Sequence, residues 1–71
     1  MAVARVTEIS STSPESFEDA IERGIARATK TLRHVQSAWI KEQEVSVGED
    51  GKVKEYKVNM LVTFLLEDTT S

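Results

Sequence analysis

Residues 56–66, YKVNMLVTFLL, decide the fold, because every second residue in this stretch is apolar or aromatic. Successive side chains of a β-strand point to opposite faces, so this alternation places a nearly continuous apolar row on one face. The row consists of Tyr56, Val58, Met60, Val62, Phe64 and Leu66. The opposite face begins polar and becomes apolar, and it carries Lys57, Asn59, Leu61, Thr63 and Leu65. The stretch therefore predicts a strand with a core on one face and a second, partly apolar face that needs its own cover.

An amphipathic helix is predicted over residues 14–33, where it can cover the apolar row. Ser13 is expected to be its N-cap and Pro14 its first residue, because the fixed φ of proline suits a helix start. Apolar and small residues recur at steps of three and four, namely Phe17, Ala20, Ile21, Gly24, Ile25, Ala28 and Leu32. Gly24 costs about 1 kcal/mol relative to alanine within a helix. We expect a close backbone contact with the sheet to compensate for this cost.

Further β-type runs lie on both sides of the helix. Residues 2–10 are short and rich in β-branched side chains, which is typical of a strand. Residues 35–47 and 52–67 are longer runs, and the Asp50–Gly51 pair between them indicates a hairpin. The order of elements is therefore predicted to be β-α-β-β.

This order defines an α+β domain that spans residues 1–71, with a frayed tail at residues 68–71. If the helix returns the chain so that the first two strands run parallel, the last strand runs antiparallel to both and lies between them. The result is a three-stranded, antiparallel-type sheet with one helix on one face. A domain this short buries only about 60% of the surface of its unfolded chain, so we expect self-association to supply additional stability.

Composition argues against several classes of function. The chain has no cysteine and a single histidine, His34, which excludes disulfides, thiolate zinc sites and a histidine cluster. Nine basic and twelve acidic residues give a net charge of -3, which argues against nucleic-acid binding. The sequence has neither a membrane-span-like apolar run nor the apolar core of a signal peptide, so we expect a soluble, cytoplasmic protein. It also has no nucleophile motif or phosphate-binding glycine loop, so we expect no enzymatic activity.

Trp39, the only tryptophan, is predicted to lie on the face of the sheet that the helix leaves uncovered. In its strand, Ala38 and Ile40 suit the helix side. Alternation then gives the uncovered face four side chains, those of Ser37, Trp39, Lys41 and Gln43. Two interpretations of Trp39 remain open. The indole either anchors an interface between subunits or stacks on a flat aromatic ligand held between them.

Several short motifs occur in a fixed order along the chain: TSPESFEDAI, ARATKTLR, WIKEQ, GEDGKVKEY and VTFLLED. Together, over residues 3–68, they resemble the dodecins, small flavin-binding proteins of bacteria and archaea. The resemblance implies a β-α-β-β subunit, a hollow homododecamer, and flavins bound in stacked pairs where subunits meet. It also implies storage or sequestration of a flavin, whether FMN, riboflavin or FAD, without catalysis.

The resemblance further implies where a flavin would bind, and two of those positions differ in this chain. The stacking tryptophan of the family corresponds to Ser37, and Trp39 follows two residues later, on the same face and about 6.6 Å further along the strand. A family glutamine that hydrogen-bonds the polar edge of the flavin corresponds to Lys57. Lysine can donate to a carbonyl but cannot accept from a ring N–H. The residues expected at the flavin site are Trp39, Ser37, Lys57 and Gln43.

The leading hypothesis is a homo-oligomeric flavin-binding or flavin-storage protein with its ligand between subunits. An alternative is a dodecamer that binds flavin weakly or not at all and has a structural role or holds another small ligand or a cation. A third is an adaptor whose uncovered face binds a different protein. Glu42 and Glu44 share one strand face, which is compatible with a cation site at a symmetry axis, although a solvated edge is the simpler interpretation.

Overall fold

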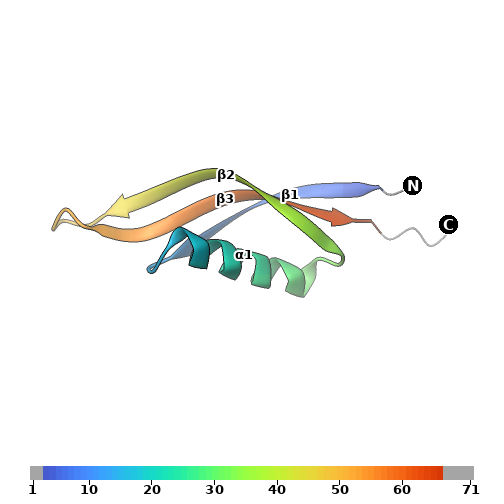
Figure 1. Cartoon of the computed structure of the whole chain (residues 1–71), viewed down its shortest axis with the longest axis horizontal. Helices are drawn as coiled ribbons and strands as arrows, with labels where there is room; N and C mark the ends of the chain where they lie inside the picture. The colour runs from blue at the N-terminus through green and yellow to red at the C-terminus, as the bar shows by residue number, and fades with distance from the viewer. Residues whose placement is uncertain (1–2, 67–71) are drawn as a thin grey trace.

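The computed structural model describes residues 3–66 of the chain. Its elements are, in order, β1 (Ala4–Ser13), α1 (Phe17–Thr31), β2 (Val35–Val47) and β3 (Val53–Leu65). The sheet has the order β1-β3-β2, and β3 runs antiparallel to both neighbours. Figure 1 shows α1 on one side of the three strands. The predicted α+β class, the β-α-β-β order and the central place of the last strand are confirmed. The tail predicted at residues 68–71 lies outside the described residues.

The face of the sheet that α1 covers, here called the inner face, holds the core. Val58, Met60 and Val62 of β3 are each 0% exposed, and Ala20 of α1 packs against them. Partly buried hydrophobic side chains surround this group, namely Ile9, Phe17, Ile21, Ile25, Leu32, Val35, Ala38 and Ile40. Burial of each valine or methionine side chain contributes about 1.5–3 kcal/mol. The prediction that the apolar row packs on the helix is confirmed for Val58, Met60 and Val62, whereas Leu66, the last residue of the predicted row, lies beyond β3 and is exposed.

Gly24 explains how closely α1 approaches the sheet. A Cβ atom added at Gly24 would overlap Met60 Cε and would lie 3.1 Å from Ser11 Cβ. A larger residue would therefore displace the buried methionine or push the helix away from β1 and β3. The predicted reason for a glycine in the middle of the helix, a close contact with the sheet, is confirmed.

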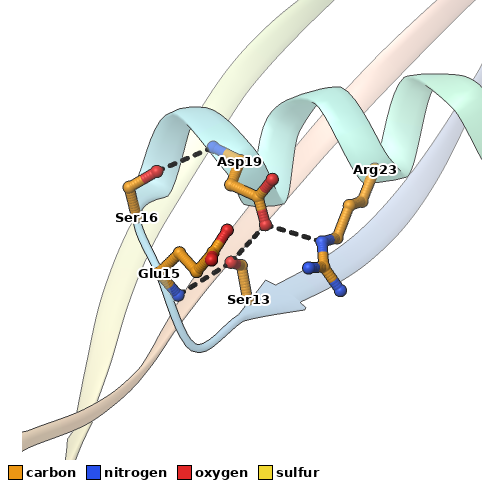
Figure 2. Close-up of polar contacts among 5 residues, drawn as sticks. All are labelled: Ser13, Glu15, Ser16, Asp19 and Arg23. Carbon is orange, nitrogen blue, oxygen red and sulfur yellow. Dashed lines mark hydrogen bonds and ion pairs between the residues drawn. The ribbon is translucent and has the colours of Figure 1, made fainter.

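The start of α1 differs from the prediction. The N-cap is Ser16, whose Oγ accepts a hydrogen bond from the backbone N–H of Asp19 at 3.0 Å (Figure 2). Strand β1 extends beyond the predicted residues 2–10 as far as Ser13, which pairs with Tyr56. The predicted N-cap at Ser13 and helix start at Pro14 are wrong, because strand pairing keeps the backbone extended through Ser13 and delays the first helical turn.

Ser13 instead ties the end of β1 to the first turn of α1 (Figure 2). This buried side chain donates from Oγ to Asp19 Oδ2 at 2.5 Å and accepts from the backbone N–H of Glu15 at 2.9 Å. Arg23 Nε lies 2.6 Å from the same carboxylate oxygen. The hydrogen bond from Ser13, followed by the hydrogen bond and positive charge of Arg23, lowers the pKa of the Asp19 carboxyl, although partial desolvation opposes this change.

Two connections use a left-handed backbone conformation. Gly51 has a φ of 80°, which glycine adopts without steric cost, and it lies in the hairpin turn predicted at Asp50–Gly51. His34 has a φ of 59° and joins α1 to β2. Its backbone carbonyl accepts a hydrogen bond from the N–H of Leu65 at 3.0 Å, which secures the start of β2 against the end of β3. The helix ends at Thr31, slightly before the predicted end at residue 33.

The molecule is elongated, with principal dimensions of 57 × 19 × 13 Å. Its Cα radius of gyration is 15.0 Å, whereas a compact domain of this length has a value of about 11 Å. The hairpin of β2 and β3 extends past the N-terminal end of α1 (Figure 1) and exposes Val45, Val47 and Val53. A single copy of the chain therefore leaves much of this hairpin unpacked. Within residues 3–66, no helix has the length and apolar character needed to cross a membrane.

Candidate ligand-binding face

The face of the sheet opposite α1, here called the outer face, carries the tryptophan. Trp39 of β2 pairs with Leu61 of β3, which in turn pairs with Glu8 of β1. Paired residues of antiparallel strands share a face, so these three side chains form one row across the sheet. Trp39 is 70% exposed, because α1 lies on the other side of the sheet. The prediction that Trp39 projects from the uncovered face is confirmed.

A β-bulge at Lys41 changes which side chains share the outer face with Trp39. The register passes directly from Ile40 to Glu42, so Lys41 is an extra residue in β2. Beyond the bulge, Gln43 pairs with the core residue Val58 and therefore lies on the inner face. The prediction that Gln43 shares a face with Trp39 is wrong, because simple alternation does not allow for the extra residue.

The same bulge brings two carboxylates onto the outer face. Glu42 pairs with Asn59, and its Oε1 accepts a hydrogen bond from Asn59 Nδ2 at 3.0 Å. Glu44 pairs with Lys57, and its Oε1 lies 3.9 Å from Lys57 Nζ. The amide and the ammonium group of β3 are therefore each engaged by a carboxylate of the neighbouring edge strand.

Ser37 and Lys41 lie on either side of Trp39 along β2. Ser37 pairs with Thr63, which places it on the outer face in the row next to Trp39. Lys41 Nζ lies 3.4 Å from Glu8 Oε2, so an ion pair links the two edge strands β1 and β2 over the central strand. Exposed ion pairs contribute only about 0.2–1 kcal/mol each. This pair therefore adds little to the stability of the fold.

Three of the four residues predicted to form the ligand site share the outer face. Ser37 and Trp39 are close neighbours, whereas Lys57 is four residues from the partner of Trp39, about 13 Å along the strand. Gln43 is on the inner face. The sequence prediction did not include Asn59, which lies between Lys57 and the tryptophan row. The alternation of β3 was the signal that could have identified it.

Residues 3–66 of a single copy do not enclose the tryptophan. A groove of about 490 Å³ lies between β1 and α1, where Ile9, Gly24 and Leu32 contribute to its lining, but Trp39 is on the other side of the sheet. A ligand stacked on the indole therefore needs a second layer to cover it. Among residues 3–66, no group of three or more histidine, aspartate or glutamate side chains is arranged to hold a metal ion.

The architecture is shared with a solved protein. A crystal structure of a protein from Thermus thermophilus superposes on this chain with a TM-score of 0.89 and 45% sequence identity. The match covers 97% of this chain and 100% of that chain. The small β-α-β-β sheet with one helix is thus a known fold, matched over nearly the whole chain.

The family model named Dodecin matches residues 3–67, and the chain belongs to the dodecin family. Dodecin from Thermus thermophilus is 46% identical over 67 residues, which span 94% of this chain and 96% of the relative. Calcium dodecin from Mycobacterium tuberculosis is 33% identical over 64 residues, which span 90% of this chain and 89% of the relative. The resemblance inferred from the sequence motifs is confirmed.

Proposed function

We propose that this chain stores or sequesters a flavin in the cytoplasm without catalysing a reaction, and that copies of a homododecamer hold the ligand between them. The observation that carries this proposal is the exposed indole of Trp39, which no element within residues 3–66 covers. FMN, riboflavin and FAD share a flat isoalloxazine ring, and an exposed indole offers a flat aromatic surface on which such a ring can stack.

A ligand held between copies would satisfy both interpretations of Trp39. The indole lies beside Leu61, and the exposed Val6 of β1 lies on the same face in the next row, so the outer face is partly apolar and favours contact with a second layer. Ring-on-ring stacking contributes roughly 1 kcal/mol beyond the burial of area. A flat ring sandwiched between two such faces would bury the indole and would also join the copies. Membership of the dodecin family supports the association of several copies.

Titration of riboflavin or FMN with the protein tests the proposal, because stacking on an indole quenches flavin fluorescence. Removal of one stacking aromatic costs about 1–3 kcal/mol, so Trp39→Ala should weaken flavin affinity at least about fivefold. Trp39→Phe should retain part of the affinity. Gln43→Ala, on the inner face of the same strand, is the matched control and should bind like the unmodified protein. Unchanged flavin fluorescence at micromolar protein would remove the storage role.

A native mass spectrum of the purified protein tests the assembly and reports any retained flavin. The expected mass is twelve times the 7.9 kDa of one chain, plus the mass of bound ligand. A monomer or a dimer that retains no ligand would contradict the proposed shell and would favour the adaptor hypothesis.

A second candidate is a dodecin-fold assembly that binds flavin weakly or not at all and holds a cation. It is favoured by the relative named calcium dodecin and by the presence of Glu42 and Glu44 on the outer face. Because residues 3–66 of one chain contain no metal-binding group of three or more ligands, the site would need carboxylates from several copies. Calcium titration by calorimetry separates the candidates. A heat that Glu44→Gln abolishes, without any flavin quenching, would favour the cation site.

A further inference from the structure

We infer that the carboxamide of Asn59, rather than the ammonium group of Lys57, binds the polar edge of the planar ligand that stacks on Trp39. This inference rests on the proposed function and adds a specificity-determining residue to the same site. Its basis is the arrangement of the outer face, where an exposed aromatic ring and an oriented amide lie in neighbouring rows.

The spacing of the two side chains suits a fused ring system. Asn59 and Leu61 are two residues apart on β3, and β1 pairs with this strand in an unbroken register, so both side chains point to the outer face. Trp39 is the direct partner of Leu61, which makes Asn59 its diagonal neighbour. Diagonal neighbours across a sheet are about 7–8 Å apart. A tricyclic ring lying on the indole can therefore bring one edge to Asn59 once the exposed Lys41 side chain, whose Nζ lies 3.4 Å from Glu8 Oε2 across β3, swings away.

The hydrogen bond to Glu42 orients the amide. Asn59 Nδ2 donates to Glu42 Oε1 at 3.0 Å, and a carboxylate only accepts, so the nitrogen side of the amide faces Glu42. Asn59 Oδ1 and the second N–H remain as an adjacent acceptor and donor on a half-buried side chain. This pair complements a lactam or imide edge, where a ring N–H stands beside a carbonyl, as it does in the isoalloxazine ring of flavins.

Lys57 is less suited to this role. It lies one row further from Trp39 than Asn59, and its Nζ is 3.9 Å from Glu44 Oε1. An ammonium group only donates hydrogen bonds, so it cannot accept from the N–H of an imide. The two residues therefore make different predictions. Asn59 should discriminate ligands by their N–H, and Lys57 should not.

Glu42 is a positioning residue in this scheme, because it acts on the ligand through the amide of Asn59. Glu42→Ala releases the amide and allows both of its orientations. We expect this variant to weaken riboflavin binding less than Asn59→Leu does. We also expect it to reduce discrimination between ligands that carry the N–H and ligands that lack it, an effect that a merely structural role would not produce.

The experiment compares riboflavin with its N3-methyl derivative, which lacks the imide N–H, by fluorescence quenching on the assembled protein. Loss of one hydrogen bond in a covered site corresponds to about a tenfold change in affinity, so the unmodified protein should prefer riboflavin by about tenfold. Asn59→Leu should weaken riboflavin binding by a similar factor and abolish the preference. Lys57→Leu, the matched control on the same face, should change the riboflavin affinity by less than about twofold and keep the preference.

The outcomes separate this inference from the proposed function. If the unmodified protein does not bind riboflavin at micromolar concentration, both fail. If it binds riboflavin but does not distinguish the N3-methyl derivative, the inference alone is overturned, and this comparison does not depend on the folding of any variant. The inference also fails if Lys57→Leu removes the preference and Asn59→Leu keeps it. Native mass spectrometry checks that each variant assembles like the unmodified protein.

Discussion

The inner and outer faces of the sheet share the strand β3 but differ in how they are covered. On the inner face, Val58, Met60 and Val62 are fully buried beneath α1. On the outer face, the row through Leu61 ends at an exposed Trp39. The difference follows from the number of layers, because residues 3–66 contain one helix and it covers one face. The core is therefore complete within one chain, whereas the proposed ligand site needs an assembly.

The two edge strands, which contribute side chains to both faces, differ in the regularity of their pairing with β3. The pairing of β1 with β3 is unbroken, but the pairing of β2 with β3 contains three register shifts. An edge strand tolerates such irregularities, and a bulge re-aims the side chains that follow it. The bulge at Lys41 turns Glu42 toward Asn59 and removes Gln43 from the outer face. The side chains that β2 presents on each face beyond Lys41 therefore depend on this local irregularity.

The largest expected effect is found by comparing two adjacent residues of β3 that lie on opposite faces of the sheet. Met60→Ala leaves a cavity in the inner-face core and should lower the free energy of unfolding by about 2–5 kcal/mol. Leu61→Ala, the matched control on the outer face, should act mainly on the association of copies. Urea unfolding at two protein concentrations distinguishes them, because only an effect on association depends on concentration. A Met60→Ala loss that disappears at high protein concentration would contradict a core completed within one chain.

A smaller effect is expected at Gly24, where the helix touches the inner face. Gly24→Ala improves helix propensity by about 1 kcal/mol, but the new methyl group overlaps Met60 Cε, and overpacking typically costs about 1–3 kcal/mol. We expect a net loss of about 1 kcal/mol in thermal or urea unfolding, since Met60 can adjust only partly within the core. Ala26→Gly, on the exposed side of the helix, should also cost about 1 kcal/mol. Alanine should therefore be less stable than glycine at position 24 and more stable than glycine at position 26. A stabilised Gly24→Ala protein would show that the contact is loose.

The inner face is predictable from the sequence because its signals are local and repeated. The alternation through Val58, Met60 and Val62 identifies the buried face, and the spacing around Gly24 identifies the helix stripe. The turn at Gly51 has its own local signal, because its backbone conformation has a positive φ, which glycine adopts without steric cost. Each of these features depends on residues that are close in sequence, and the structure agrees with each prediction.

The outer face and the helix start are harder to predict because they depend on pairing between distant residues. The bulge at Lys41 is visible only in the register of β2 against β3, and without it Gln43 is assigned to the wrong face. Ser13 and Ser16 are both suitable N-cap residues, and pairing of Ser13 with Tyr56 decides between them. Where tertiary pairing selects one of several acceptable local structures, the sequence pattern alone leaves the choice open.

The smallest expected effect concerns acid stability at the junction of β1 and α1, where the inner face ends. Because the hydrogen bond from Ser13 and the neighbouring Arg23 lower the pKa of Asp19, the folded chain binds this proton less readily than the unfolded chain. The contribution is fully present above the ordinary aspartate pKa of about 3.9 and is lost as the pH falls through the lowered, folded value. Urea midpoints measured below about pH 4 should therefore depend less on pH in Asp19→Asn than in the unmodified protein. Ser13→Ala should reduce the pH dependence of the urea midpoint in part. Thr12→Ala, a change at the exposed neighbouring residue, should leave it unchanged. An Asp19→Asn protein with the full pH dependence would show that this carboxyl does not couple folding to pH.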